Sequence, residues 1–473
     1  MKSMKTLYAR ILGIAFAVLF TSLSAIAAQS NQLTTGTVIE RVSCRADAGQ
    51  SYALFLPSRY TPQQHWPIIY CFDPGARGRV PVERFKEAAE KYGVIVAGSN
   101  NSRNGSSDVA IAVNAMMKDT GERLMIDPRR VYTAGFSGGG RVATSVALSL
   151  GDAIAGVVAC GGGFPSSVTP SKTVTFALFA TAGTDDFNYP EMHNLTRAFD
   201  KLGLAYRFAT FAGGHEWLTP ALADEALAWL ELQATKTGRR ARDDAFINAI
   251  FDQNMNRAQA DAKAGKSYEA YIRYSDTARD FKGLRDVADA EQRAAELKDD
   301  KAVKQAIKQE DEQERGQQAR IQELYTLKES LKSNNERPLV YSDLQKRFAD
   351  LKKKSDAPQP SAERTIARRV VNQFFVHLSE EANMLSQRKQ YAAAAEDLAL
   401  VALLAPDNPR VHYNLACAYA LNRDRSRAIE SLRRAVEKGF KDAAAIERNN
   451  DLDVLRDDPA YKQIVEGLKN RRQ

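Results

Sequence analysis

The most constraining feature of the sequence is a glycine-rich turn around one serine. Gly135-Phe136-Ser137-Gly138-Gly139 follows a short β-branched and aromatic run, 130–134, which predicts a strand, and precedes 141–148, which predicts a helix. So tight a strand-to-helix turn is strained and requires small residues beside the serine. It exposes the Ser137 hydroxyl at a sheet edge and aims the Gly138 amide at the same point. A glycine-rich turn with a chance serine is the alternative.

Strand-like and helix-like runs alternate along residues 34–236, which predicts an α/β domain. The sheet is expected to be mostly parallel, with helices on both faces. The first two strand-like runs lack a long connection and favour an antiparallel hairpin. The predicted strands are 36–42, 51–56, 67–72, 93–97, 131–136, 156–160, 174–180 and 205–211. The predicted helices are 82–92, 108–125, 139–150, 190–202 and 221–233.

The remainder of the chain is predicted to be helical. Residues 237–355 are rich in charged helix formers, and 296–332 in particular predicts a solvated long helix or a coiled-coil arm. The proline-containing stretch 355–361 predicts a linker. Residues 361–473 predict an all-α repeat domain, because 394–404 aligns with the segment that begins 34 residues later at Ala428.

That period and the small and large apolar positions resemble the tetratricopeptide repeat. The matching residues are Leu415, Ala416, Tyr419, Ala428 and Ala435. His412 departs from the pattern, because a tryptophan is usual there. The resemblance implies a groove that binds a protein or peptide partner, whereas plain helical hairpins are the alternative.

The N-terminus predicts export. Basic residues precede the apolar stretch 11–25, and Ala25-Ile26-Ala27 offers a cleavage site, so residues 1–28 are interpreted as a signal peptide. We expect a periplasmic or secreted protein, with an uncleaved membrane anchor as the alternative. No later stretch predicts stable membrane insertion. The net charge of +8 is spread among many acids and no nucleic-acid motif is present, so nucleic-acid binding is not expected.

Ser137 needs partners, because a serine hydroxyl is a weak nucleophile without a base and an orienting carboxylate. Of the five histidines, only His193 and His215 follow Ser137 within the α/β region. We favour His215, which directly follows a strand-like run, over His193, which lies inside a predicted helix. Asp185 and Asp186, also directly after a strand-like run, are both candidate acids.

A tetrahedral intermediate also needs preorganised N–H donors. We expect one from Gly138 and a second from the glycine-containing loop 72–79, where Ala76 is favoured and Gly75 and Arg77 are alternatives. Candidate substrate contacts are Arg77, for an anionic group, and also Trp217 and Asn101, the latter in the polar loop 100–105.

Residues 36–234 resemble an α/β-hydrolase domain, most closely the esterase group of polyhydroxybutyrate depolymerases, feruloyl and acetylxylan esterases and dienelactone-hydrolase-like proteins. The motifs that carry the resemblance are 127–132, 135–140, 183–186 and 214–217. It implies Ser137 as nucleophile, Asp186 as acid and His215 as base, with no metal or cofactor. The oxyanion loop departs from the common His-Gly-Gly form and leaves the second donor open.

These features predict an exported serine esterase that cleaves carboxylic esters through an acyl-enzyme and carries a helical repeat domain for protein binding. The connections after the strands are short, and 161–172 is the only candidate flap, so an open cleft for small or polymer-borne esters is expected. Two alternatives remain. One is an inactive hydrolase-fold protein that acts through its repeats, and the other is a serine peptidase of the prolyl-oligopeptidase type.

Overall fold

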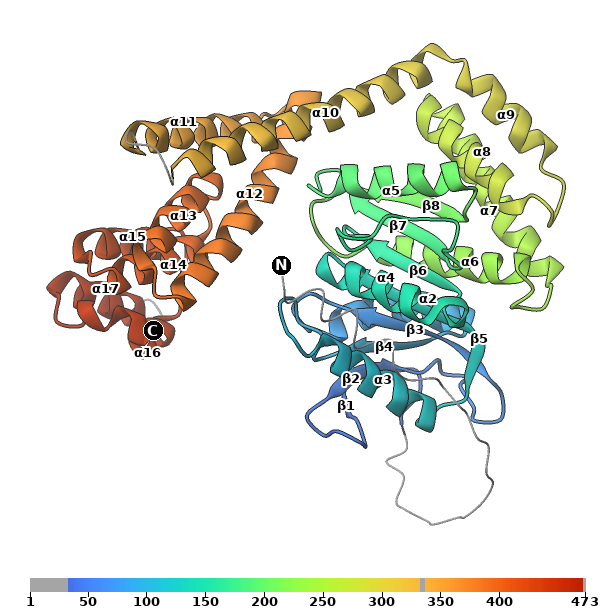
Figure 1. The fold of residues 1–473 in the computed structure, drawn as a ribbon, viewed down its shortest axis with the longest axis horizontal. Helices are drawn as coiled ribbons and strands as arrows, with labels where there is room; N and C mark the ends of the chain where they lie inside the picture. Colours follow the sequence, from blue (N-terminus) through green and yellow to red (C-terminus); the bar gives the residue numbers. More distant parts are fainter. Residues whose placement is uncertain (1–32, 332–336, 471–473) are drawn as a thin grey trace. The chain divides into compact units, whose positions relative to one another are not determined.

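The computed structural model describes residues 33–331 and 337–470. The chain divides into two compact units, of which the first ends at Lys308 and the second begins at Gln309 (Figure 1). The predicted signal peptide, residues 1–28, lies outside the described residues. None of the helices in the described ranges combines the length and the apolar character needed to cross a bilayer.

The first unit is built on one eight-stranded sheet with the order β1-β2-β4-β3-β5-β6-β7-β8. Strand β2 pairs antiparallel with both β1 and β4, and all pairs from β4 to β8 are parallel. The predictions of a mostly parallel sheet and of an antiparallel start are therefore confirmed. The strands are β1 (Val38–Ser43), β2 (Ser51–Phe55), β3 (Trp66–Phe72), β4 (Ile95–Ser99), β5 (Ile126–Phe136), β6 (Gly156–Cys160), β7 (Ala177–Gly183) and β8 (Tyr206–Phe211).

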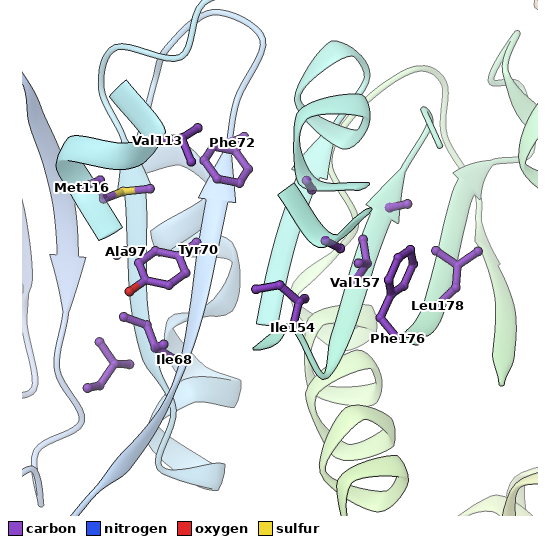
Figure 2. Packing of buried hydrophobic residues seen from close by; sticks show 14 of the residues in the cluster. Ile68, Tyr70, Phe72, Ala97, Val113, Met116, Ile154, Val157, Phe176 and Leu178 are labelled. Atoms are coloured by element: carbon purple, nitrogen blue, oxygen red, sulfur yellow. The ribbon is translucent and has the colours of Figure 1, made fainter. Parts of the chain in front are cut away.

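Helices cover both faces of this sheet, as predicted. Because side chains alternate along a strand, Ile68, Tyr70 and Phe72 of β3 enter one core, and Ile69 and Cys71 enter the other. Figure 2 shows the first of these cores. Burial on both faces explains why the strands read as continuous apolar runs. The helices are α2 (Arg79–Tyr92), α3 (Val109–Arg123), α4 (Gly138–Leu150), α5 (Tyr189–Leu202) and α6 (Pro220–Lys236).

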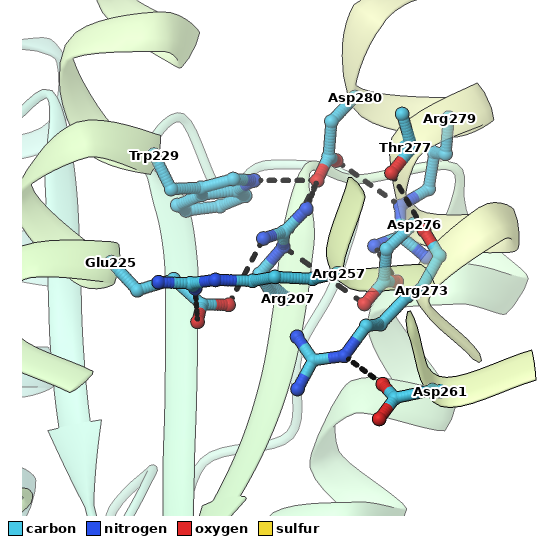
Figure 3. A network of polar contacts seen from close by, with 10 residues as sticks. All are labelled: Arg207, Glu225, Trp229, Arg257, Asp261, Arg273, Asp276, Thr277, Arg279 and Asp280. Carbon is cyan, nitrogen blue, oxygen red and sulfur yellow. Dashed lines mark hydrogen bonds and ion pairs between the residues drawn. The ribbon is translucent and has the colours of Figure 1, made fainter. Parts of the chain in front are cut away.

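Three further helices belong to the first unit, namely α7 (Asp244–Lys263), α8 (Ser267–Phe281) and α9 (Ala288–Lys298). Leu232 of α6 joins Phe251 of α7 and Phe281 of α8 in one apolar cluster. A buried ion pair between Arg207 of β8 and Asp280 of α8 ties the same helices to the sheet (Figure 3). The domain boundary predicted at residue 236 therefore does not coincide with a boundary between the compact units.

The second unit consists of helices that pack against their neighbours along the chain. The division falls within α10 (Lys301–Ser330), and the predicted linker lies between α11 and α12. Ala394 of α13, Ala416 of α14 and Ala428 of α15 are buried in a common core, where small side chains let the helices approach closely. The tetratricopeptide assignment itself stays a prediction. The helices are α11 (Arg337–Ser355), α12 (Ala362–Gln387), α13 (Tyr391–Leu404), α14 (Pro409–Leu421), α15 (Arg425–Glu437), α16 (Ala443–Arg448) and α17 (Pro459–Asn470).

Candidate active site

Ser137 occupies the turn between β5 and α4. Its φ of 54° and ψ of −122° place it in a region that non-glycine residues rarely adopt. Strain of this kind persists only where the surrounding structure enforces it, and it is concentrated at functional sites. The side chain is half-buried, so the hydroxyl is supported by the fold and still reachable.

Three glycines permit this turn because the chain passes close to other backbone there. A Cβ on Gly135 would lie 2.0 Å from the carbonyl oxygen of Gly139. A Cβ on Gly139 would lie 2.0 Å from the carbonyl oxygen of Phe72 at the end of β3, and one on Gly140 would lie 2.0 Å from that of Gly162. Only glycine lacks the atom that would collide, so the small residues around Ser137 are a packing requirement.

The structure brings the three predicted catalytic residues into one hydrogen-bonded chain. His215 Nε2 lies 2.8 Å from Ser137 Oγ, and His215 Nδ1 lies 2.9 Å from Asp186 Oδ1. Asp186 is fully buried and also accepts a hydrogen bond from the Asn188 amide. With the Nδ1 hydrogen directed to the carboxylate, Nε2 is left to accept the proton of the serine.

Two aromatic rings hold the imidazole of His215. The ring centroids of Phe136 and Phe187 lie 4.5 Å and 4.2 Å from that of His215. The alternative base, His193, instead stacks on Phe208 with a centroid distance of 5.5 Å. Of the two adjacent aspartates, Asp186 is the one bonded to His215. The geometry therefore selects one member from each pair of alternatives.

The predicted second oxyanion donor, Ala76, does not fit the structure. Its amide N–H donates to the carbonyl oxygen of Asp73 at 2.9 Å. The alternatives are engaged too, because the amides of Gly75 and Arg77 donate to Asp73 Oδ1 at 2.8 Å and 3.4 Å. Gly138, at the first position of α4, keeps its predicted place, since first-turn amides have no partner within their own helix.

Two residues that were predicted to contact substrate, Arg77 and Trp217, hydrogen-bond to Asp73. The Arg77 guanidinium donates to both carboxylate oxygens of Asp73, at 2.8 Å and 3.0 Å. Trp217 is buried and donates its indole N–H to Asp73 Oδ2 at 2.9 Å, so the prediction that it contacts substrate is not supported. Burial raises the pKa of Asp73, but hydrogen bonds from Arg77, Trp217 and Gly75 outweigh it and leave the pKa below its ordinary value.

No protein-family model and no curated protein sequence matches the chain. Among solved structures, the chain is similar to a ferulic acid esterase (18% identity, TM-score 0.36, covering 41% of this chain and 97% of the other). It is also similar to an S-formylglutathione hydrolase of Staphylococcus aureus (14% identity, TM-score 0.32, covering 38% of this chain and 90% of the other). A third similar structure is dipeptidyl peptidase 4 of Porphyromonas gingivalis (15% identity, TM-score 0.32, covering 40% of this chain and 34% of the other).

The strand order, the antiparallel β2 and the strained turn at Ser137 define the architecture without reference to those similarities. This region has the α/β-hydrolase fold. Similarity at such low identity and TM-score does not transfer a substrate to this chain.

The polar loop 100–105 places a different residue beside the Ser137 turn from the one predicted. Both polar atoms of the Asn101 side chain are already hydrogen-bonded. Its Oδ1 accepts from the Ser51 amide at 2.9 Å, and its Nδ2 donates to the Gly49 carbonyl oxygen at 3.2 Å. Asn104, which sequence analysis did not single out, places its carboxamide against Gly138. The sequence indicates the loop, but it does not indicate which asparagine packs against Gly138.

The predicted flap, 161–172, is tied down at its start in the hydrolase fold. Arg141 of α4 donates to the carbonyl oxygen of Phe164 at 2.7 Å and to Glu191 of α5 at 2.8 Å. The Gly163 amide donates to the same Glu191 carboxylate at 3.1 Å. These contacts hold the beginning of the segment in place beside α4.

Proposed function

We propose that the α/β-hydrolase domain is a serine esterase that cleaves carboxylic esters through a covalent acyl-enzyme. The observation that carries the proposal is the hydrogen-bonded chain from Ser137 through His215 to Asp186, with heavy-atom distances of 2.8 Å and 2.9 Å. A strained serine, an imidazole in reach of its hydroxyl and a buried carboxylate behind that imidazole are the parts that activate an alcohol.

The steps follow from these positions. His215 Nε2 takes the hydroxyl proton as Ser137 Oγ bonds to the ester carbonyl carbon, and the Gly138 N–H stabilises the resulting oxyanion. The tetrahedral intermediate collapses, the bond to the alkoxy oxygen breaks, and His215 returns the proton to the leaving alcohol. Asp186 stabilises the imidazolium between these transfers. A water, deprotonated by His215, then releases the acid and regenerates Ser137.

Peptide hydrolysis would use the same three groups, so substrate chemistry must be tested directly. Esters are proposed because an alcohol is a better leaving group than an amine. The Ser137 hydroxyl is half-buried, and the side chain of His215 is 12% exposed. This degree of exposure is compatible with small or polymer-borne esters.

Export and partner binding complete the proposal and rest on the sequence. The signal-peptide pattern in residues 1–28 suggests a periplasmic or secreted enzyme. The repeated alanine and leucine positions of residues 361–473 suggest a surface for a protein or peptide partner. Expression of the full chain in a bacterium, followed by fractionation and N-terminal sequencing, tests export, with cleavage after Ala27 or Ala28 expected.

The activity is tested with purified protein on p-nitrophenyl acetate, p-nitrophenyl butyrate, methyl ferulate and a panel of peptide substrates. Ester hydrolysis is expected, and Ser137→Ala should lower kcat by several orders of magnitude. A fluorophosphonate probe should label the native protein and leave Ser137→Ala unlabelled. Preference for peptides would favour a peptidase. Absence of both turnover and labelling would favour an inactive protein that acts through its helices.

A further inference from the structure

We propose that the side-chain carboxamide of Asn104 is the second donor of the oxyanion hole. The inference rests on the proposed esterase function and adds a catalytic residue to it. A tetrahedral oxyanion is stabilised when at least two preorganised donors converge on it. In this domain the Gly138 amide supplies one of these donors, and a second donor is needed.

The polar groups of the loop after β3 already donate hydrogen bonds within that loop. The amides of Gly75 and Ala76 donate to Asp73, at 2.8 Å to its carboxylate and at 2.9 Å to its carbonyl oxygen. The Arg77 side chain is held on the same carboxylate through two nitrogens. An amide N–H that already donates a hydrogen bond within its own loop is not available to a transient oxyanion, so another group has to supply the second hydrogen bond.

Asn104 lies where that group is needed. A Cβ added to Gly138 would stand 2.0 Å from Asn104 Oδ1 and 2.4 Å from Nδ2. The carboxamide therefore packs on the backbone of the residue whose N–H faces the oxyanion. Glycine at position 138 is required for this approach, because any other side chain would occupy the same space.

The loop that carries Asn104 is fixed while its side chain is available. The Asn104 amide donates to the Pro74 carbonyl at 2.9 Å, and Arg103 forms a bridge with Gly75. Within the described parts of the chain, the Asn104 carboxamide makes no hydrogen bond, and the residue is exposed. Rotation about the terminal torsion exchanges oxygen and nitrogen, and an oxyanion beside Gly138 selects the nitrogen.

Asn104→Ala is expected to lower kcat of ester hydrolysis by 10²- to 10³-fold at most, the usual effect of losing one such donor, with KM little changed. Asn104→Asp should lose at least as much at neutral pH, because a carboxylate cannot donate and repels the oxyanion. Asn114→Ala is the matched control, since Asn114 is exposed on α3 and lies outside the site. That control should retain the native kcat.

A trifluoromethyl ketone separates a catalytic role from a structural one, because its adduct with Ser137 carries an oxyanion. Asn104→Ala should raise its inhibition constant by about the factor by which kcat/KM falls, with the melting temperature unchanged. Native kcat in Asn104→Ala would overturn the inference while leaving the esterase intact. Loss of kcat with unchanged ketone affinity would also overturn it. Failure of the native protein to react with the fluorophosphonate would instead reject the proposed function.

Discussion

The buried carboxylate of Asp73 accepts a hydrogen bond from the indole N–H of Trp217 at 2.9 Å, across 144 positions of sequence. Asp73 opens the loop after β3, and Trp217 follows His215 by two residues. The contact therefore links the loop after β3 to the loop that carries His215. In the described part of the chain neither residue is hydrogen-bonded to Ser137, so we expect their effect on activity to come from holding the two loops in place.

Asp73→Asn should destabilise the first unit and lower kcat, because the new amide nitrogen faces groups that are all donors. About 1–3 kcal/mol of unfolding free energy should be lost, the cost of leaving buried donors unsatisfied. Trp217→Phe, which removes one hydrogen bond and keeps an aromatic ring, should cost about 1 kcal/mol. Denaturant unfolding followed by fluorescence measures both. Equal stability of the native protein and Asp73→Asn would contradict this reading.

The same carboxylate predicts an acid dependence. Since the folded pKa of Asp73 lies below its ordinary value, its stabilising contribution is complete above about pH 4 and is lost as the pH falls through the folded pKa. Unfolding free energies measured between pH 3 and pH 7 should show a smaller acid loss in Asp73→Asn than in the native protein. Parallel curves would show that Asp73 titrates alike in both states.

Gly139→Ala should disrupt the turn, because the added Cβ would lie 2.0 Å from the Phe72 carbonyl oxygen. We expect loss of fluorophosphonate labelling and a lower melting temperature. Gly121→Ala is the matched control, since Gly121 lies in α3 and a Cβ there meets nothing within 4 Å. That variant should gain about 1 kcal/mol, the difference in helix propensity between alanine and glycine. Similar effects of the two substitutions would show that close backbone approach is not the cause.

Asp280→Asn should loosen the attachment of α8 to the sheet. Asp280 Oδ2 lies 2.8 Å from the buried Arg207 guanidinium and accepts from the Trp229 indole at 2.9 Å (Figure 3). Breaking a buried pair leaves an uncompensated charge, at a cost of about 3–5 kcal/mol. Glu291→Gln, which removes the exposed pair with Lys282, should cost under about 1 kcal/mol. Chemical unfolding of both variants measures the two losses of unfolding free energy. Comparable losses would contradict the conclusion that the buried pair of Arg207 and Asp280 stabilises the first unit.

The second unit should become less stable as the pH rises from about 4 to 6. Burial raises the pKa of Asp397 to about 6, against the opposing charge of Lys328, whose Nζ lies 3.2 Å away. Because the folded pKa exceeds the unfolded value of about 3.9, protonated Asp397 favours the folded state, and this benefit fades up to the folded pKa. Asp397→Asn should flatten this pH dependence.

The measurement for Asp397 uses the full chain. All three tryptophans, Trp66, Trp217 and Trp229, lie in the first unit. A far-ultraviolet circular dichroism transition that fluorescence does not follow therefore belongs to the second unit. If Asp397→Asn shows the native pH dependence of that transition, Asp397 is not its source.

Periodicity along the chain was enough to predict the architecture of residues 34–236, because both helix and strand patterns are local. Ser137, Asp186 and His215 could be proposed from the order of residue types and from the scarcity of histidines. The roles of Ala76, Trp217 and Asn101 could not, since each depends on which distant group accepts or donates its hydrogen bonds. The predicted export and partner binding remain predictions.

By itself the sequence determined the fold class, the turn around Ser137 and the short set of groups able to serve it, because strand alternation, helix period and small residues act over a few positions. Only the tertiary structure decided that Asp73 accepts hydrogen bonds from the amides of its own loop and that Asn104 packs against Gly138. It also decided that α7–α9 join the sheet through Arg207 and Asp280. Those outcomes depend on polar groups that meet only after the chain has folded, and no local pattern specifies which of several similar residues will be the partner.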